Sequence, residues 1–473
     1  MSTCHVVLVP FMAYGHMIPM ADLAVLFASR GLQTTIITTS SSAHRLTKSI
    51  QKTANYSYPI SLHIVKFNAG EAGLPPGIDN PDHAMSNEHL SRLFEAISTL
   101  QEPIEQFVEQ SQPDCIVADM FFPWTVDIAA RFNIPRIAFN GTGFFPQCVA
   151  HEVMRLNGPT VSSDSEPFVV PNLPHEIKLT RKQLPKIESE EFKVFLKVIM
   201  QAVEAEAKSY GVIVNSFYEL EPEYAHHYRE VMKRKAWHVG PVSLCGKSID
   251  DKLERGKKSS INEDACLKWL GSKPHGSVIY VSFGSIVKVT SSQIYEIAMA
   301  LEACDVSFVW VIKKDQETSV LDGFEARMQA KGKGLIIKGW APQVLILDHE
   351  SVGGFVTHCG WNSVLEGVSS GVAMVAWPVM AEQFYNAKLV TDVLQIGVSI
   401  GDVEWSAEST CEGVKRDAIE RAVAKVMGVE EGGEMRKRAK ELKEKASTAV
   451  IHGGSSHSDL TTFIQNIKGF KSK

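Results

Sequence analysis

The sequence predicts an α/β protein built from two doubly wound units that face each other across a cleft. The chain has 473 residues, more than one hydrophobic core usually holds, so two domains of roughly 200 residues each are expected. Short β-rich runs alternate with longer amphipathic segments, which is typical of a parallel sheet wrapped by helices. Both halves open with a strand, a small-residue loop and a helix, as doubly wound units do.

The N-terminal half contains the first set of expected strands. His5–Pro10 reads as a buried strand, followed by a turn over Met12–His16 and a helix over Ile18–Ser29. Gly31 is expected to end that helix, because glycine accepts the left-handed conformation found after many helices. The other strands expected here are Thr34–Thr39, Ser61–Phe67, Cys115–Asp119, Arg136–Asn140 and Gly211–Asn215.

A second series of strands begins near Ser277. Val278–Phe283 ends in the turn Gly284–Ser285, and further strands are expected at Phe308–Ile312, Leu335–Lys338, Gly354–Thr357 and Ala373–Trp377. Residues 243–262 are polar and poor in large apolar side chains, which predicts an exposed linker. The expected organisation is therefore an N-terminal domain over residues 1–242 and a C-terminal domain over residues 263–450. A last segment, residues 451–473, could pack back on the first domain.

Composition excludes several classes of protein. The formal charge of −6 provides no basic field for nucleic acid. The eight cysteines contain no C-x-x-C pair, so neither a zinc ribbon nor a dithiol site is expected. The N-terminal apolar run lacks a basic region, and the longest apolar stretch, Gly367–Ala381, is too short to span a bilayer. A monomeric cytoplasmic protein that binds small molecules is expected.

The most informative segment follows the strand Gly354–Thr357. His358-Cys359-Gly360 precedes a helix that is expected to start at about Trp361. Gly360 allows close approach of a ligand to the backbone, and the free N–H groups at a helix start favour a phosphate. Uncharged side chains around this point could hold a diphosphate without a metal; they are His358, Asn362 and Ser363.

Other polar and aromatic residues extend this site. Glu366 lies one helical turn beyond Asn362, ~5 Å further along the axis, where its carboxylate could accept hydrogen bonds from a ribose diol. Trp340 and Gln343 precede the strand and could stack on and hydrogen-bond to a base. Two residues after the next strand suit sugar hydroxyls; they are Glu382 and Gln383. Taken singly, each feature could also be a helix cap, core packing or solvated surface.

The whole segment from Trp340 to Gln383 resembles the donor-binding signature of the plant family 1 UDP-glycosyltransferases. The match includes W-A-P-Q, H-C-G-W-N-S, L-E-G and a closing E-Q, and the segment has the length of the family motif. The resemblance extends from an early P-F-x-x-x-G-H to a late G-G-S-S. It implies a GT-B fold and an inverting O-glucosyltransferase with UDP-glucose as co-substrate, no tightly bound cofactor and no metal.

The resemblance also assigns roles to individual residues. Trp340 and the backbone of Ala341 would contact uracil, and Gln343 and Glu366 the ribose. The diphosphate would be held by His358, Gly360, Asn362, Ser363 and Ser285, and the sugar would meet Trp361, Glu382 and Gln383. The closing Gln is associated with glucose in this family. Three positions depart from the usual pattern: Glu382 stands for Asp, Ala373 for Pro, and Thr142, expected near the sugar, is followed by Gly rather than Ser.

His16 and Asp119 are the candidate catalytic pair. Each lies at the carboxyl end of an expected strand. A neutral imidazole can accept the proton of an attacking hydroxyl, and a buried carboxylate can orient and stabilise the resulting imidazolium. The sequence has 16 histidines, and an Asp in this position could simply cap a turn. In the family that the donor segment resembles, a His in this loop is the base and an Asp in an I-V-x-D strand orients it.

Irregular stretches that carry aromatic residues are expected to form the acceptor pocket. They are residues 68–86, 121–124, 143–147 and 167–184. The candidate pocket residues are Met85, Phe121, Phe122, Phe144 and Phe145, which suit a flat or polycyclic apolar ligand. Ordinary core packing is the alternative for each aromatic residue. The segment FNAGEAGLPPG resembles a segment of the plant enzymes that act on triterpenoids, steroids, flavonoids and phenylpropanoids.

Two other functions are compatible with paired α/β units. A nucleotide-dependent oxidoreductase would need a G-x-G-x-x-G after an opening strand, and neither half has one. A non-catalytic nucleotide-sugar-binding protein would not need both the candidate base and the entire donor segment.

Overall fold

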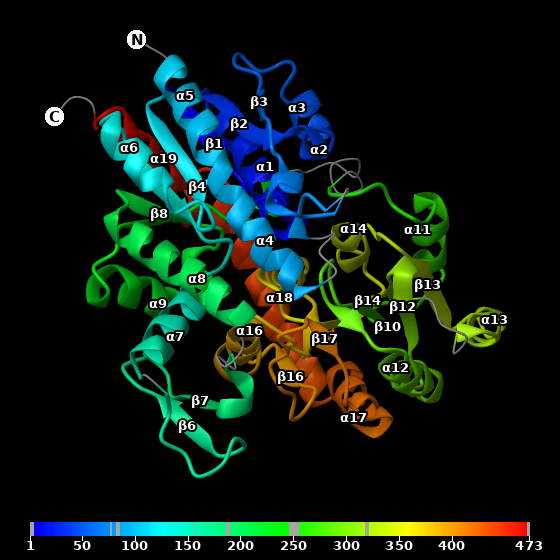
Figure 1. Ribbon diagram of the computed structural model, residues 1–473. Helices are drawn as coiled ribbons and strands as arrows, with labels where there is room; N and C mark the ends of the chain where they lie inside the picture. The colour runs from blue at the N-terminus through cyan, green and yellow to red at the C-terminus, as the bar shows by residue number, and fades with distance from the viewer. Residues whose placement is uncertain are drawn as a thin grey trace.

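The computed structural model describes residues 4–75, 78–81, 86–156, 158–185, 190–245, 255–316 and 321–470. It has two large parallel sheets with helices on their faces, which confirms the α/β class (Figure 1). The first sheet runs, from edge to edge, through β3 (Ser61–Val65), β2 (Gln33–Thr39), β1 (His5–Val9), β4 (Cys115–Asp119), β5 (Arg136–Phe139), β8 (Gly211–Val214) and β9 (Ala236–His238).

The second sheet contains the C-terminal strands. Its order is β13 (Gly334–Lys338), β12 (Ser307–Ile312), β10 (Val278–Ser282), β14 (Val352–Thr357), β15 (Ala373–Ala376) and β16 (Gly397–Ser399). Every expected strand is present, with bounds that agree to within a residue or two. We refer to the parts of the chain around the first and second sheets as the N-terminal and C-terminal units. The predicted boundaries at residues 242 and 263 stay predictions.

Several short strands were not expected from the sequence. Besides β9 and β16, an antiparallel hairpin joins β6 (Pro167–Val170) to β7 (Ile177–Thr180) within a stretch expected to be irregular. A second short pair joins β11 (Lys288–Val289) to β17 (Thr410–Cys411). Segments of two to four residues carry too little periodicity to be recognised without their pairing partner.

The helices alternate with the strands. In the N-terminal unit they are α1 (Tyr14–Ser29), α2 (Ser40–Ala43), α3 (Thr47–Lys52), α4 (Asn87–Ile97), α5 (Gln101–Ser111), α6 (Thr125–Arg131), α7 (Phe144–Arg155), α8 (Glu190–Lys208) and α9 (Pro222–His226). In the C-terminal unit they are α11 (Glu263–Gly271), α12 (Ser291–Ala303), α13 (Phe324–Ala330), α14 (Gln343–Leu347), α15 (Trp361–Ser370), α16 (Gln383–Lys388) and α17 (Arg416–Met427).

Helix α1 differs from the expectation at its start. The sequence predicted a turn over Met12–His16 and a helix from Ile18, whereas the helix begins at Tyr14. The carbonyl of Ala13 accepts hydrogen bonds from the N–H groups of His16 and Met17, at 3.0 and 2.8 Å. The expected turn is therefore the first turn of the helix. The helix stops where expected, since Gly31 has φ +76°.

Both faces of the first sheet are buried. Along β1, Val6 and Leu8 belong to one apolar cluster, whereas Val7 and Val9 belong to a cluster on the opposite face. This explains why the strand reads as a continuous apolar run rather than an alternating one. A third cluster extends from the N-terminal unit into the second sheet and includes Phe144 and Trp361. The two units therefore share part of one core.

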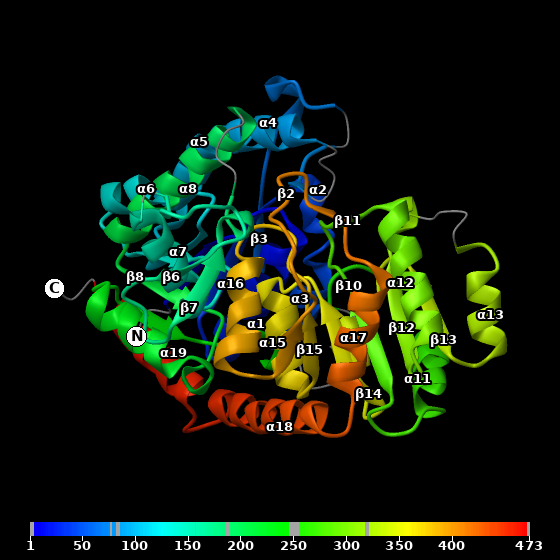
Figure 2. The same ribbon diagram turned by 90° about the horizontal axis from the view of Figure 1, so that it is seen from below.

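The last two helices pack against both units and connect them. Helix α18 (Glu431–Val450) lies under α15, and α19 (Ser455–Lys468) continues to the first sheet (Figure 2). The ring of Phe463 in α19 is 5.5 Å from that of Phe27 and 5.3 Å from that of Trp237. The C-terminal segment thus packs against the N-terminal unit. Within the described residues, no helix combines the length and apolar character needed to cross a bilayer.

Removal of the Phe463 side chain tests how much the packing of α19 contributes to the free energy of unfolding. Phe463 is fully buried, so Phe463→Ala should lower the free energy of unfolding by about 3–5 kcal/mol. Guanidinium-induced unfolding would measure the change. The control is Val429→Ala, because Val429 is 89% exposed and its truncation should change stability by less than about 0.5 kcal/mol. Equal stabilities of the two variants would contradict the packing role of α19.

Candidate active site

His16 and Asp119 meet at the carboxyl edge of the first sheet. Strands β1 and β4 are parallel neighbours, so the loop after β1 and the end of β4 lie side by side. The Nδ1 atom of His16 is 2.7 Å from Oδ2 of Asp119, and the His16 and Asp119 side chains are 24% and 0% exposed. The other carboxylate oxygen of Asp119 accepts from the N–H of Phe121 at 3.1 Å. The carboxylate is thus held in place, and Nε2 lies on the opposite edge of the ring.

Aromatic rings surround the His16 imidazole. The rings of Phe11 and Phe121 each have their centroids 5.4 Å from that of His16. Phe94 in α4 and Phe195 in α8 pack on Phe121, at 5.2 and 6.4 Å. The sequence analysis did not identify Phe94 or Phe195, because their helices are far from His16 in the chain. Together these rings form an apolar surface beside the imidazole.

The candidate acceptor residues divide into two groups. Phe121 is partly exposed and contacts His16. Phe122, Phe144 and Phe145 are at most 1% exposed and belong to the apolar clusters of the fold. Their burial favours the packing alternative that the sequence left open for them, since a fully buried ring presents no surface to a ligand. Met85 lies outside the described residues.

His358 occupies a position defined by two glycines. A Cβ atom on Gly284 or on Gly360 would each come within 2.6 Å of the His358 ring. Gly360 was expected to admit a ligand to the backbone, and in the structure it also makes room for this imidazole. Burial, followed by the charge of Lys313, lowers the pKa of His358 to about 4. The imidazole is therefore neutral near pH 7. Ser285 follows Gly284 in the same turn.

The start of α15 is attached to the N-terminal unit by two hydrogen bonds. The indole N–H of Trp361 donates to the carbonyl of Asn215 at 2.8 Å. The amide Nδ2 of Asn362 donates to the carbonyl of Gly15, next to His16, at 2.7 Å. The expected phosphate-binding helix start therefore lies directly opposite the first turn of α1, which carries His16.

Gln343, Ser363 and Glu366 form one hydrogen-bonded group. The Nε2 atom of Gln343 donates to Oγ of Ser363 at 3.1 Å and to Oε2 of Glu366 at 2.7 Å. Glu366 is 5% exposed. The Trp340 ring lies 5.4 Å from the Tyr14 ring of the N-terminal unit, and Ala341 is 8% exposed. The residues assigned to uracil and ribose thus come together from α14, from α15 and from the loop that precedes α14.

Glu382 and Gln383 lie beyond the end of β15. The Oε1 atom of Gln383 accepts from the N–H groups of Val379 and Met380, both at 3.0 Å, which fixes the loop between strand and helix. Burial raises the pKa of Glu382, and the positive charge that His16 carries when protonated acts in the opposite direction. Glu382 is therefore within electrostatic range of the His16–Asp119 pair.

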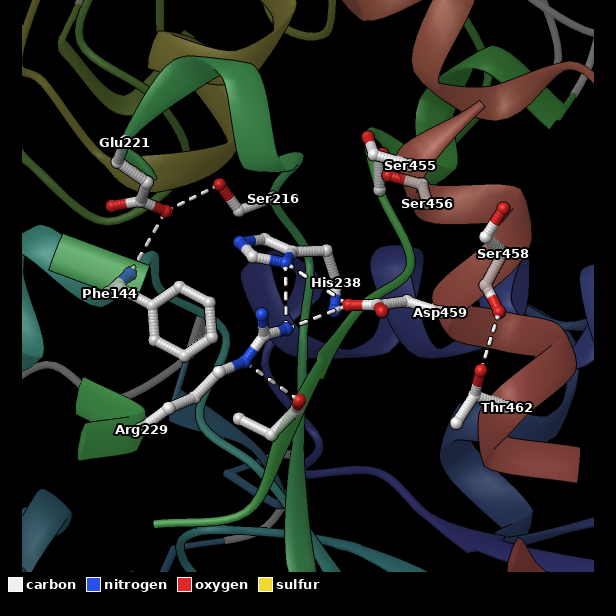
Figure 3. A network of polar contacts seen from close by, with 12 residues as sticks. Phe144, Ser216, Glu221, Arg229, His238, Ser455, Ser456, Ser458, Asp459 and Thr462 are labelled. Carbon is white, nitrogen blue, oxygen red and sulfur yellow. Dashed lines mark hydrogen bonds and ion pairs between the residues drawn. The ribbon is translucent and has the colours of Figure 1, made fainter. Parts of the chain in front are cut away.

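Glu221 is a buried carboxylate that the sequence analysis missed. It accepts hydrogen bonds from Phe144 N–H at 3.0 Å, Phe145 N–H at 2.7 Å and Ser216 Oγ at 2.5 Å (Figure 3). It thereby caps the start of α7, directly after Thr142 and Gly143. A Cβ atom on Gly143 would lie 2.4 Å from the Trp361 ring, so Glu221 supports the loop that packs on Trp361. The sequence could not pair Glu221 with a helix start so distant in the chain.

A second polar network fastens α19 beside this loop. Oδ2 of Asp459 lies 2.8 Å from Nη2 of Arg229 and 2.9 Å from the backbone N of His238 (Figure 3). The His238 ring packs edge-on against Phe144, with centroids 4.8 Å apart. The C-terminal helix thus contacts, through His238, the helix that follows Thr142. Among the described residues, no group of three or more His, Cys, Asp or Glu side chains is arranged to hold a metal.

The pH dependence of stability tests the environment of Glu221. Burial raises the pKa of Glu221 from 4.5 to about 7, so the folded protein binds this proton more tightly than the unfolded chain. The stability that protonation provides is complete below pH 4.5 and is lost as the pH rises to 7. We compare the wild type with Glu221→Gln, which cannot titrate at this position. The free energy of unfolding of the wild type minus that of the variant should fall by at most ~1.4 kcal/mol per pH unit in this window and level off above it.

Chemical denaturation between pH 5 and 8 would measure that difference. The hydrogen bond from Ser216 lowers the pKa of Glu221. Ser216→Ala should therefore move the point at which the curve levels off to a higher pH. A difference that is flat or rises with pH between 5 and 7 would contradict a raised pKa.

Comparison with known proteins identifies the family. The family model for UDP-glucoronosyl and UDP-glucosyl transferase matches residues 5–415. Scopoletin glucosyltransferase of Nicotiana tabacum is 53% identical over 100% of this chain and 99% of its own. UDP-glucose flavonoid 3-O-glucosyltransferase 7 of Fragaria ananassa is 50% identical over 97% and 95%.

A solved structure shows the same fold. The chain superposes on a Glycyrrhiza uralensis UGT, complexed with glycyrrhetinic acid 3-O-monoglucuronide, with a TM-score of 0.92 and 40% identity, over 99% of this chain and 96% of that one. The two sheets described above are therefore those of a GT-B fold. Because the family model covers most of the residues and full-length relatives are about half identical, this chain belongs to the family of UDP-glucoronosyl and UDP-glucosyl transferases and is a UDP-glycosyltransferase.

Proposed function

We propose that this enzyme transfers glucose from UDP-glucose to a hydroxyl of a small, mainly apolar acceptor, with inversion at the anomeric carbon. The observation that carries this proposal is the 2.7 Å contact between His16 and Asp119. The first turn of α1, which carries His16, accepts a hydrogen bond from Asn362 at the start of α15 through the Gly15 carbonyl. A base and a phosphate-binding helix start thus face each other, as a displacement at a carbon between them requires.

The proposed reaction is a single displacement. Nε2 of His16 accepts the proton of the acceptor hydroxyl while that oxygen forms a bond to the anomeric carbon. The bond from the anomeric carbon to the phosphate oxygen breaks, and UDP leaves with the electron pair. Asp119 keeps the imidazole in the tautomer with the proton on Nδ1 and stabilises the imidazolium that forms. The N–H groups at the start of α15 stabilise the charge that develops on the leaving phosphate.

The donor residues have distinct proposed roles. Trp340 and Ala341 contact uracil, and Gln343 and Glu366 the ribose. The diphosphate is bound by Ser285, His358, Gly360, Asn362 and Ser363. The sugar is met by Thr142, Trp361, Glu382 and Gln383. Because these phosphate contacts are uncharged groups at a helix start, we propose that transfer needs no metal, and that EDTA leaves turnover unchanged.

The acceptor is proposed from the apolar surface beside His16. The partly exposed rings of Phe94, Phe121 and Phe195 suit a flat or polycyclic ring system with one hydroxyl directed at the imidazole. The names of the relatives include scopoletin and flavonoid substrates, and the Glycyrrhiza uralensis structure contains a triterpenoid glucuronide. We therefore propose phenylpropanoids, flavonoids, steroids and triterpenoids as the classes to screen.

The cellular compartment is proposed from the state of the cysteines. Cys115, Cys148 and Cys266 are buried free thiols, as expected in a reducing compartment. This supports a cytoplasmic enzyme, and we propose that it acts as a monomer.

His16→Ala should lower kcat by about 10²–10⁴-fold, because the base that accepts the hydroxyl proton is removed. Asp119→Asn should lower kcat by about 10²-fold or more, because an amide cannot stabilise the imidazolium. Product formation from UDP-glucose and an acceptor library, followed by mass spectrometry, would measure both. His226→Ala is the control, since His226 is exposed on α9.

Three outcomes would contradict the proposed function. Unchanged turnover in His16→Ala would exclude His16 as the base. UDP binding without any transfer over the whole library would indicate a non-catalytic nucleotide-sugar-binding protein. An absorbance change with a nicotinamide cofactor would indicate an oxidoreductase.

A further inference from the structure

Arg255, within the predicted linker of residues 243–262, lies between the two units at the donor site. Its Nε atom is 2.8 Å from Oδ2 of Asp22 in α1. Its Nη1 atom pairs with Oε1 of Glu366 in α15. The side chains of Asp22, Arg255 and Glu366 are 21%, 12% and 6% exposed, so this is a partly buried ion triad. One guanidinium thus connects the N-terminal unit to the carboxylate proposed to bind ribose.

The residues after Arg255 lie against Trp340. A Cβ atom on Gly256 would lie 2.3 Å from Cζ2 of the indole. The backbone N–H of Ser260 donates to the Trp340 carbonyl at 2.8 Å, and Trp340 N–H donates to Oγ of Ser260 at 2.9 Å. The Nζ atom of Lys257 is 4.6 Å from the centroid of the Tyr14 ring and 5.9 Å from that of Trp340. Residues 256–260 of the linker are therefore part of the wall around the proposed uracil site.

The charge of Glu366 is unfavourable for the proposed ligand. The diphosphate of a UDP-sugar carries two negative charges and would bind about one helical turn from this buried carboxylate. The proposed phosphate ligands on α15, Asn362 and Ser363, carry no positive charge, and His358 is neutral because its pKa is about 4; Lys313, whose charge acts on His358, is a cation near this site. A cation paired with Glu366 would offset the repulsion between the carboxylate and the diphosphate.

Arg255 leaves Glu366 able to accept from a ribose diol. A carboxylate has about four lone-pair sites. Arg255 uses one on Oε1 and Gln343 uses one on Oε2. Each oxygen therefore retains acceptor capacity, and the two donors together fix the plane of the carboxylate.

We propose that Arg255 is a positioning residue of the donor site, which offsets part of the charge of Glu366 and orients it so that this carboxylate binds ribose while the diphosphate binds one turn away. Asp22 holds the guanidinium in place and connects the donor site to the N-terminal unit. This inference rests on the proposed function, in which Glu366 is the ribose acceptor. It adds residues of the linker and of α1 that lie outside the donor segment.

The test measures binding of UDP-glucose without acceptor, by calorimetry, in a double-mutant cycle. Arg255→Gln should raise Kd about tenfold, and Arg255→Lys should raise it less, because the charge is kept. Glu366→Gln should also raise Kd. In the Glu366→Gln background, adding Arg255→Gln should raise Kd by a smaller factor than it does in the wild type, because the carboxylate that Arg255 orients is gone and only the pairing with Asp22 is still lost. In steady state, Arg255→Gln should raise KM for UDP-glucose and leave kcat within about twofold.

Two matched controls separate this role from a general effect on the fold. Lys182→Gln removes another ion pair between the units, with Asp402 at 3.1 Å, and should leave Kd unchanged. Gly256→Ala should weaken binding, since its Cβ would displace Trp340. Gly276→Ala is the control for backbone strain, because Gly276 also has a positive φ, +64°, but open space around it. Thermal melting would verify that each variant is folded.

The outcomes distinguish this inference from the proposed function. If Glu366→Gln leaves Kd unchanged, the ribose assignment fails, and the inference fails with it. If Glu366→Gln weakens binding but Arg255→Gln does not, or tightens it, only the inference is overturned. An equal loss from Arg255→Gln in both backgrounds would overturn it as well, since Arg255 would then act independently of Glu366.

Discussion

The attachment of the start of α15 to the N-terminal unit is the interaction on which the site depends. Trp361 and Asn362, the first two residues of the helix, donate to the carbonyls of Asn215 and Gly15. Side chains donate both hydrogen bonds, so neither bond uses the backbone N–H groups that a helix start offers to a phosphate. The same two residues thus fix how the units face each other and form part of the proposed donor site. A shift between the units would separate His16 from the donor helix.

Glycine and buried carboxylates make this close approach possible. Gly284 and Gly360 leave room for the His358 ring, and Gly143 leaves room for Trp361. Each is a place where a side chain would push apart two segments that must touch. Glu221 then satisfies the N–H groups at the start of α7. Buried polar groups of this kind are costly unless paired, and here the pairing ties one loop of the site to the core.

The C-terminal helix supports the site from a distance. Asp459 in α19 contacts Arg229 and His238, and His238 packs on Phe144 at the start of α7. Phe144 is also capped by Glu221. A continuous set of contacts therefore connects the last helix of the chain to the loop of Thr142 and Gly143. The linker performs a similar task on the other side, through Arg255 and Gly256.

What could be predicted from the sequence is local. The strands of both sheets follow from short apolar runs, because a parallel strand is buried on both faces along its length. The donor residues from Trp340 to Gln383 could be assigned because they lie on consecutive elements, where the strand, the turn and the helix are read from neighbouring residues. His16 lies in the first turn of the helix that follows β1, and Asp119 ends β4. The parallel pairing of β1 with β4 brings these two positions together.

Contacts between distant segments were decided only by the tertiary structure. Phe144 and Phe145 are aromatic residues of the kind that line ligand pockets, yet both are buried. The sequence did not show this, because the elements that cover them lie far away in the chain. Glu221 caps α7 from 76 residues away, and Arg255 meets Asp22 and Glu366 across 233 and 111 residues. The charge and burial around a residue depend on which segments the fold places side by side. Local patterns along the sequence do not show which distant segments those are.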